Sequence, residues 1–134
     1  MPNRVPWDRN FSVGNDVIDD QHRQILAHCE ALADCCAADH GNGSDAEFRY
    51  AFDQLMALAR THFATETSLL ADRDFPDIES YRHECDEYEY LAAEIVTTDN
   101  FDKLELQRFL TLWWAGHVMD AAKQHRAYLN DAVD

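Results

Sequence analysis

The stretch FRYAFDQLMALARTHFATETSLL, residues 48–70, carries the pattern that decides the fold. Its apolar residues recur at intervals of three and four, the spacing with which an α-helix directs side chains to one face. The stripe consists of Phe48, Phe52, Leu55, Ala59, His62, Glu66 and Leu69. His62 and Glu66 interrupt it one helical turn apart. The stretch therefore predicts an amphipathic helix whose buried face carries an imidazole and a carboxylate.

Three further segments show the same helical period, and breaks near residues 12–15, 40–43, 74–76 and 97–100 separate the four. Their stripes are Ile18, His22, Ile25, Cys29, Leu32 and Cys36; Ile78, Tyr81, Cys85, Tyr88, Ala92 and Ile95; and Leu106, Leu110, Trp113, His117, Ala121, Gln124 and Tyr128. Because the connections are short, neighbouring helices must run antiparallel. The predicted fold is all-α, an up-down-up-down four-helix bundle that forms a single domain over residues 1–134.

The composition excludes several classes of partner. The chain has 26 acidic and 11 basic residues, a formal charge of −15, so an acidic surface is expected that repels nucleic acid and anionic membranes. No apolar run approaches the roughly 18 residues of a membrane span, and MPNRVPWDRN lacks the apolar core of a signal peptide. We therefore expect a cytoplasmic protein whose four cysteines are reduced thiols.

Three histidines and one glutamate stand at stripe positions where apolar residues are expected. They are His22, His62, Glu66 and His117. One inward histidine is usually a hydrogen-bonded core residue, but burying a carboxylate together with three imidazoles is costly without a further partner. A nitrogen and an oxygen ligand one turn apart are how bundle cores hold iron, manganese or zinc. The pattern favours a metal site over a structural polar network.

The third helix contains a second His/Glu pair with ligand spacing, in YRHECDEYEYLAAEI, residues 81–95. His83 lies two residues from Tyr81, about 200° around the helix, so His83 and Glu87 are predicted to face solvent. Tyr81 and Cys85 are predicted to face the bundle core instead. For the remaining histidines, His28, His40 and His125, the helical period predicts no inward partner.

Four segments of the chain resemble one known family. They are WDRNFSVGNDVIDDQHRQIL at residues 7–26, HFATE at 62–66, FPDIESY at 75–81 and FLTLWWAGHV at 109–118. Together they resemble a bacteriohemerythrin, a member of the hemerythrin family, over essentially the whole chain. The resemblance implies a four-helix bundle with a carboxylate-bridged, non-heme di-iron centre that binds O2 reversibly, for oxygen carriage, supply or sensing.

The resemblance also implies an incomplete set of ligands. The positions that match family ligands are His22, His62, Glu66 and His117. The two third-helix histidines of the family fall on Tyr81 and Cys85, and its bridging aspartate falls on Ala122. We therefore expect the two-iron site to be lost or weakened, leaving one metal ion.

The expected metal is iron, one ion rather than two, with zinc or manganese as alternatives. Cys85 or Tyr81 is a candidate fifth ligand; otherwise Cys85 is a small buried thiol and Tyr81 a hydrogen-bonded core aromatic. Asp120, one turn past His117, is a further candidate oxygen donor. These residues define the predicted site.

Three functions are compatible with such a site. The first is binding or sensing of a small diatomic ligand, O2 or NO. The second is a mononuclear iron redox enzyme acting on superoxide or peroxide, and the third is a zinc-bound or metal-free structural module. Because the chain shows no nucleophile dyad and no general base, we favour the first. The sequence does not indicate protein partners.

Overall fold

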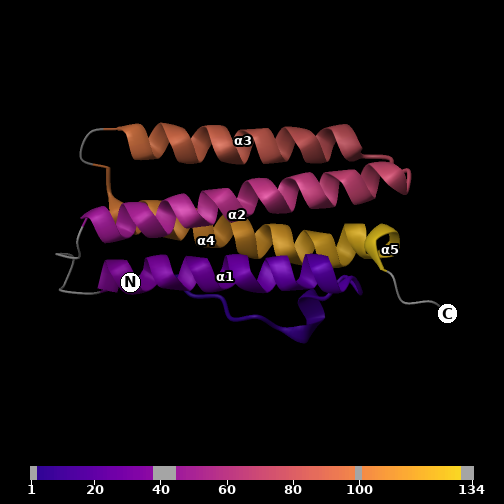
Figure 1. Cartoon of the computed structure of the whole chain (residues 1–134), viewed down its shortest axis with the longest axis horizontal. Helices are drawn as coiled ribbons and strands as arrows, with labels where there is room; N and C mark the ends of the chain where they lie inside the picture. The colour runs from indigo at the N-terminus through magenta and orange to yellow at the C-terminus, as the bar shows by residue number, and fades with distance from the viewer. Residues whose placement is uncertain (1–2, 38–44, 99–100, 131–134) are drawn as a thin grey trace.

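The protein is a bundle of four long helices, seen here in a computed structural model that describes residues 3–37, 45–98 and 101–130. The elements are η1 (Arg9–Phe11), α1 (Asp16–Ala37), α2 (Asp45–Asp72), α3 (Ile78–Thr97), α4 (Lys103–Asp120), a π-helical segment η3 (Ala121–His125) and α5 (Arg126–Leu129). The four long helices alternate in direction, with α3 at the upper edge of the view in Figure 1. The predicted all-α, up-down-up-down fold is confirmed.

The stripes predicted for the first three helices form the core. In α1 and α2 the stripe residues from Ile18 to Leu32 and from Phe48 to Glu66 are buried. In α3 the buried residues are Tyr81, Cys85, Tyr88, Ala92 and Val96. In the last turn of α3 the prediction is off by one residue, because Val96 is buried whereas Ile95, the predicted stripe residue, is only partly buried.

The stripe predicted for the fourth helix is wrong at Trp113, which is only partly buried while Trp114 is buried, and again after Ala121. The buried residues there are His125 and Leu129, whereas Gln124 is exposed and Tyr128 only partly buried. The cause of this second difference is η3, because a π turn closes i→i+5 hydrogen bonds and so takes up one residue more than an α-helical turn. Every later side chain is displaced by one position relative to a regular helix.

Three helices begin within three residues of the predicted breaks. Asn15 caps α1, with its Oδ1 accepting from the backbone N–H groups of Val17 and Ile18. Asp102 caps α4, two residues after the break predicted at residues 97–100. Residues 99 and 100 and the break at residues 40–43 lie outside the described residues. Pro76 precedes the α3 cap, Asp77, by one residue.

The segment before α1 ties the two ends of the chain together. The backbone N–H of Asn3 donates to Oε1 of Gln107 in α4 at 2.9 Å, and Asn15 Nδ2 donates to the Leu129 carbonyl at 3.2 Å. Gly14 has φ of +75°, a backbone conformation that favours glycine, and a Cβ there would lie 2.4 Å from Oδ1 of Asn130, so that side chain would have to move. These contacts fix α5, and with it the end of η3, against the start of α1.

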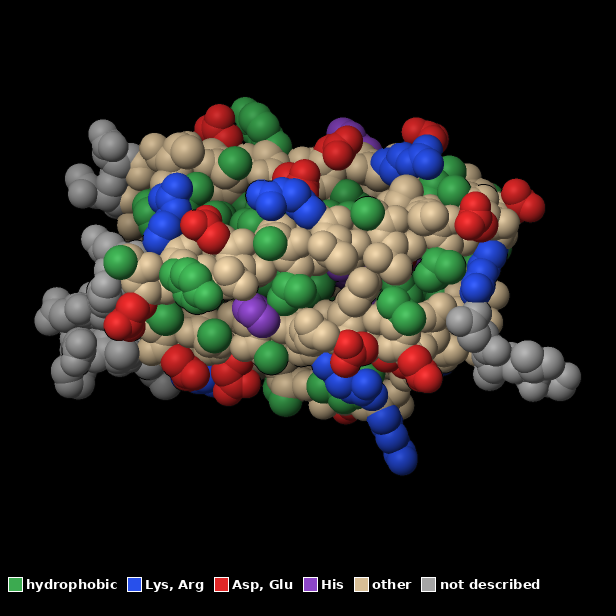
Figure 2. Space-filling view, in the orientation of Figure 1, with side chains coloured by type: hydrophobic (Ala, Val, Ile, Leu, Met, Phe, Trp, Pro, Cys, Tyr) green, Lys and Arg blue, Asp and Glu red, His purple; other side chains and the backbone are tan. Residues whose placement is uncertain are grey.

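The surface agrees with the expected distribution of charge. Figure 2 shows Asp and Glu dispersed over one face with Lys and Arg between them. Among the described acidic residues only Asp19 and Glu66 are buried, and Asp19 accepts hydrogen bonds from Ser12 and Val13. All four cysteines are free. None of the described helices is long and apolar enough to cross a membrane.

Candidate metal centre

Four buried side chains from three helices converge at the end of the bundle that carries α5. His22 lies in the second turn of α1, His62 and Glu66 lie in the second half of α2, and His117 lies in the last turn of α4. Each offers one donor atom, and the four donor atoms all lie within 4.8 Å of one another. The structure thus brings together the four residues that the sequence placed on buried stripes.

The short distances within this group centre on His62. Its Nε2 is 3.1 Å from Nε2 of His22, 3.0 Å from Nε2 of His117 and 2.9 Å from Oε1 of Glu66. The Nε2 of His117 is 3.1 Å from the same carboxylate oxygen. Ligands bound at about 2.1 Å and 90° apart around one metal ion lie about 3.0 Å from each other. The spacing therefore matches neighbouring ligands of one ion.

The hydrogen bonds around His62 determine which of its nitrogens carries the proton. Its Nδ1 is 2.8 Å from Oε1 of Gln21, and the Gln21 amide nitrogen donates to Thr65 Oγ1. Because an amide oxygen can only accept, Nδ1 of His62 carries the proton and Nε2 presents a lone pair to the centre. A ligand histidine held through its second nitrogen is typical of metal sites.

The centre consequently directs several lone pairs toward one point. The lone pair of His62 Nε2 faces the Glu66 carboxylate at 2.9 Å, and neither atom has a proton to donate. Burial lowers the pKa of both His62 and His22, so protonating these imidazoles is unfavourable. Burial alone would raise the pKa of Glu66, but attraction to His117 and hydrogen bonds from His117 and His125 hold it well below its usual value. A metal cation fits this set of donors.

Comparison with known proteins agrees with this geometry. The family described as "Hemerythrin HHE cation binding domain" matches residues 13–125. The chain belongs to the hemerythrin family. Hemerythrin-like proteins of Naegleria gruberi and Naegleria fowleri are each 26% identical to it over 129 residues, which is 96% of this chain and 97% of theirs. The chain is therefore a hemerythrin domain with a buried His/Glu site.

Two positions at which the hemerythrin resemblance implies histidine ligands carry other side chains in α3. The hydroxyl of Tyr81 donates to Oε1 of Glu66 at 2.7 Å, and burial, followed by the Glu66 charge, raises the pKa of this phenol well above its usual value. Burial raises the pKa of the Cys85 thiol to about 12. Both groups are therefore protonated at neutral pH in the metal-free centre, and Tyr81 is a hydrogen-bond donor to a candidate ligand.

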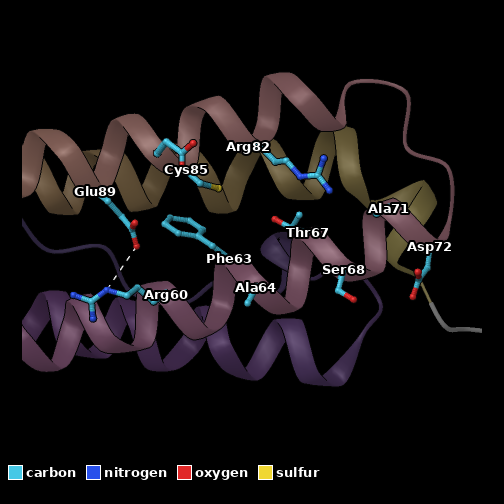
Figure 3. Close-up of a pocket in the computed structure, with 11 residues that line it drawn as sticks. Arg60, Phe63, Ala64, Thr67, Ser68, Ala71, Asp72, Arg82, Cys85 and Glu89 are labelled. Carbon is cyan, nitrogen blue, oxygen red and sulfur yellow. Dashed lines mark ion pairs between the residues drawn. The ribbon is translucent and has the colours of Figure 1, made fainter.

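Cys85 also lines a groove of about 640 Å³ between α2 and α3. In Figure 3 its sulfur and the ring of Phe63 lie at the middle of this groove, and Arg60 pairs with Glu89 at 3.8 Å near one end. Within the described residues, the sulfur is not part of the group of four mutually close donors. Cys85 thus lies between the centre and the surface.

Two further positions, Asp120 and Ala122, were considered for a carboxylate ligand. Ala122, where the resemblance puts the bridging aspartate, lines a surface hollow with Asn10, Phe11 and Met119. Asp120 is exposed and lies at a cavity of about 90 Å³, which His117 and Tyr81 also line. Asp120 is outside the group of four and lines the same cavity as His117.

His125 is a site residue that the sequence reading missed. It is buried, and its Nδ1 is 2.9 Å from Oε2 of Glu66. The expectation that it has no inward partner is wrong, because eight residues of regular α-helix would turn it about 80° away from His117. With one residue taken up by η3, it is effectively seven steps, or about 20°, from His117. Leu129, the apolar residue four positions later, was the available signal of this shift.

Aromatic rings enclose the other side of the centre. The ring of Trp113 stacks on that of His117 at 5.3 Å and 9°, and the Trp114 ring lies 5.1 Å from His117 and 5.8 Å from His62. Trp114 donates to the Tyr88 hydroxyl at 2.8 Å, which satisfies its buried N–H. The candidate ligands therefore sit between an apolar wall and a polar cavity.

Proposed function

We propose that this hemerythrin domain holds one iron ion at His22, His62, Glu66 and His117 and binds a small diatomic ligand, O2 or NO, there. The observation that carries the proposal is the convergence of these four donor atoms on one point. Nearest distances of 2.9–3.1 Å leave room for one ion between them. Three imidazoles and one carboxylate suit iron, and also zinc or manganese; the family resemblance favours iron.

The positions at which other residues replace the ligands implied by the resemblance support one ion rather than two. A second ion, about 3.5–4 Å from the first, needs ligands of its own. The α3 residues on that side are Tyr81 and Cys85, whose protons are held tightly by burial, and Ala122 has no donor group. The remaining oxygen of Glu66 contacts His125.

The cavity beside His117 supports a small ligand. Its volume of about 90 Å³ admits a few atoms and not a metabolite, and it reaches a candidate metal ligand directly. An iron ion with four protein ligands would supply an open coordination position for O2 or NO. Binding or sensing of such a molecule is therefore the function that the shape of this site supports best.

The charges around the same cavity argue against superoxide as a substrate. Asp77, Glu84 and Asp120 line it, and the described residues that line it include no lysine or arginine. A negative entrance slows the approach of an anion such as superoxide but does not repel neutral O2 or NO. The redox-enzyme alternative is therefore less favoured than ligand binding.

Metal analysis tests the stoichiometry. The protein, expressed with ample iron and passed through a desalting column, should contain close to one iron per chain by plasma mass spectrometry. Two tightly bound irons per chain would contradict the single-ion proposal. Zinc in place of iron at the same stoichiometry would support the structural alternative.

Ligand binding is tested separately on the iron-loaded, reduced protein. Anaerobic titration with NO should change the visible absorption with an end point of one NO per iron. His117→Ala removes a donor beside the cavity and should abolish the change. An iron-loaded parent that shows no response to NO or O2 would contradict ligand binding while leaving metal binding intact.

A further inference from the structure

The two oxygens of Glu66 have different surroundings. Oε1 faces His62 at 2.9 Å, His117 at 3.1 Å and the Tyr81 hydroxyl at 2.7 Å. Oε2 faces Nδ1 of His125 at 2.9 Å. One oxygen is thus directed toward the group of donors, and the other is engaged by a residue outside that group.

His125 is itself held in place by packing. Its ring meets the ring of Phe75 edge-on at 4.9 Å and the ring of Tyr81 at 5.1 Å and 88°. Phe75 lies between α2 and α3, so the imidazole is held by the turn and by α3 as well as by η3. A buried donor with this support can fix the rotation of a carboxylate about its terminal torsion, which is otherwise broad.

We propose that His125 is a positioning residue of the metal centre, whose Nδ1–H holds Oε2 of Glu66 and thereby directs Oε1 to the metal position. The inference rests on the proposed function and assigns a role to a residue outside the matched family ligands. With Oε2 held by a proton donor, Glu66 would offer only Oε1 to an ion. The carboxylate is then unable to bridge to a second ion unless this hydrogen bond breaks.

The π-helical segment η3 brings His125 into contact with Glu66. Without the residue taken up by η3, the His125 side chain would turn away from Glu66, as the regular-helix reading of the sequence requires. The contact therefore depends on a local departure from α-helical geometry in the element that follows His117.

Two variants of the full chain separate hydrogen bonding from packing. His125→Phe keeps a ring against Phe75 and Tyr81 but removes the donor, whereas His125→Asn loses the ring and can place an amide N–H where Nδ1 lies. Each variant and the parent are loaded with Co2+, and affinity is measured by competition with a chromophoric chelator. Far-UV circular dichroism checks that each is folded.

The Phe variant should bind Co2+ about ten- to a hundredfold more weakly than the parent, as loss of a group that orients a ligand typically does. Its visible Co2+ spectrum should change in shape, because the carboxylate is no longer fixed. The Asn variant should stay within about threefold of the parent. Parent-like affinity and spectrum in the Phe variant, or equal losses in both variants, would overturn the proposal.

A metal-free measurement keeps this test separate from the proposed function. In 15N-labelled apoprotein the Nδ1 proton of His125 should give a resolved, slowly exchanging resonance that shifts in Glu66→Gln. A parent that takes up no Co2+ would contradict the proposed function, and the resonance would still report on the hydrogen bond. Rapid exchange of this proton would contradict the positioning role.

Discussion

The α1–α2 side and the α3 side of the centre present different groups to the same carboxylate, Glu66. On the α1–α2 side, His22 and His62 present ring nitrogens, and Gln21 fixes the proton of His62. On the α3 side, Tyr81 presents a hydroxyl proton to Glu66. The α1–α2 side thus offers lone pairs to a cation, whereas the α3 side donates a hydrogen bond to Glu66, itself a candidate ligand.

This difference explains how Glu66 keeps hydrogen-bond partners although α3 carries Tyr81 and Cys85 where the resemblance implies histidines. A buried carboxylate deprived of partners is strongly destabilising. Here Tyr81 and His125 donate to its two oxygens, so the carboxylate is satisfied from the side where the resemblance implies a second ion. The comparison predicts large effects on metal binding from the α1–α2 side and mainly effects on stability from α3.

The largest effect is expected from His62→Ala. This residue lies within 3.1 Å of all three other donors, so its removal should lower metal affinity more than a hundredfold, beyond the loss typical of a group that only orients a ligand. Chelator competition measures the change. His28→Ala is the matched control, because His28 lies in α1 with its Nδ1 near the Gln24 carbonyl. Equal losses in both variants would break the distinction between inward and outward histidines.

Acid should destabilise the metal-free protein through the α1–α2 side. His22 and His62 have folded-state pKa values below the ordinary value of 6.5 because burial disfavours their charged forms. Below pH 6.5 the unfolded chain therefore binds more protons than the folded chain, and the free energy of unfolding falls by up to about 1.4 kcal/mol per pH unit for each histidine. Urea unfolding between pH 7.5 and 5 measures this slope. It should become smaller in His22→Gln, and an unchanged slope would show that His22 does not contribute.

Tyr81→Phe should cost stability of about 1–3 kcal/mol, because it removes a donor from a buried carboxylate. Metal should be retained, since the α1–α2 donors remain. Urea unfolding and metal analysis on the same samples provide the two readouts. Complete loss of metal in Tyr81→Phe would instead assign the phenol oxygen as a ligand.

The smallest effects are expected on the outer face of α3. His83 and Glu87 have side chains 79% and 61% exposed and lie 3.7 Å apart, as the helical period predicted. His83→Ala should change stability by less than about 0.5 kcal/mol and leave metal content unchanged. Cys85→Ala, two residues away on the inner face, should cost about 1–2 kcal/mol. If His83→Ala lost metal while Cys85→Ala kept it, the assignment of the two faces would be reversed.

Helical period alone was enough to predict the fold and the four converging donors. It placed His22, His62, Glu66 and His117 correctly, because each lies within a long regular helix. It failed for His125, because a π turn displaces the period by one residue and only Leu129, four residues later, marks the displacement in the sequence. It also did not predict the contact of Gln21 with His62, because that contact depends on how α1 and α2 face each other across the core.

The apolar wall of the centre also gives the protein an optical reporter. Trp113 and Trp114 lie with their rings 5.3 and 5.1 Å from that of His117, and both are within contact range of Phe63. A paramagnetic ion held by His117 would quench the emission of these two indoles at this range. Intrinsic fluorescence can therefore follow the filling of the site in real time, without a dye or a label.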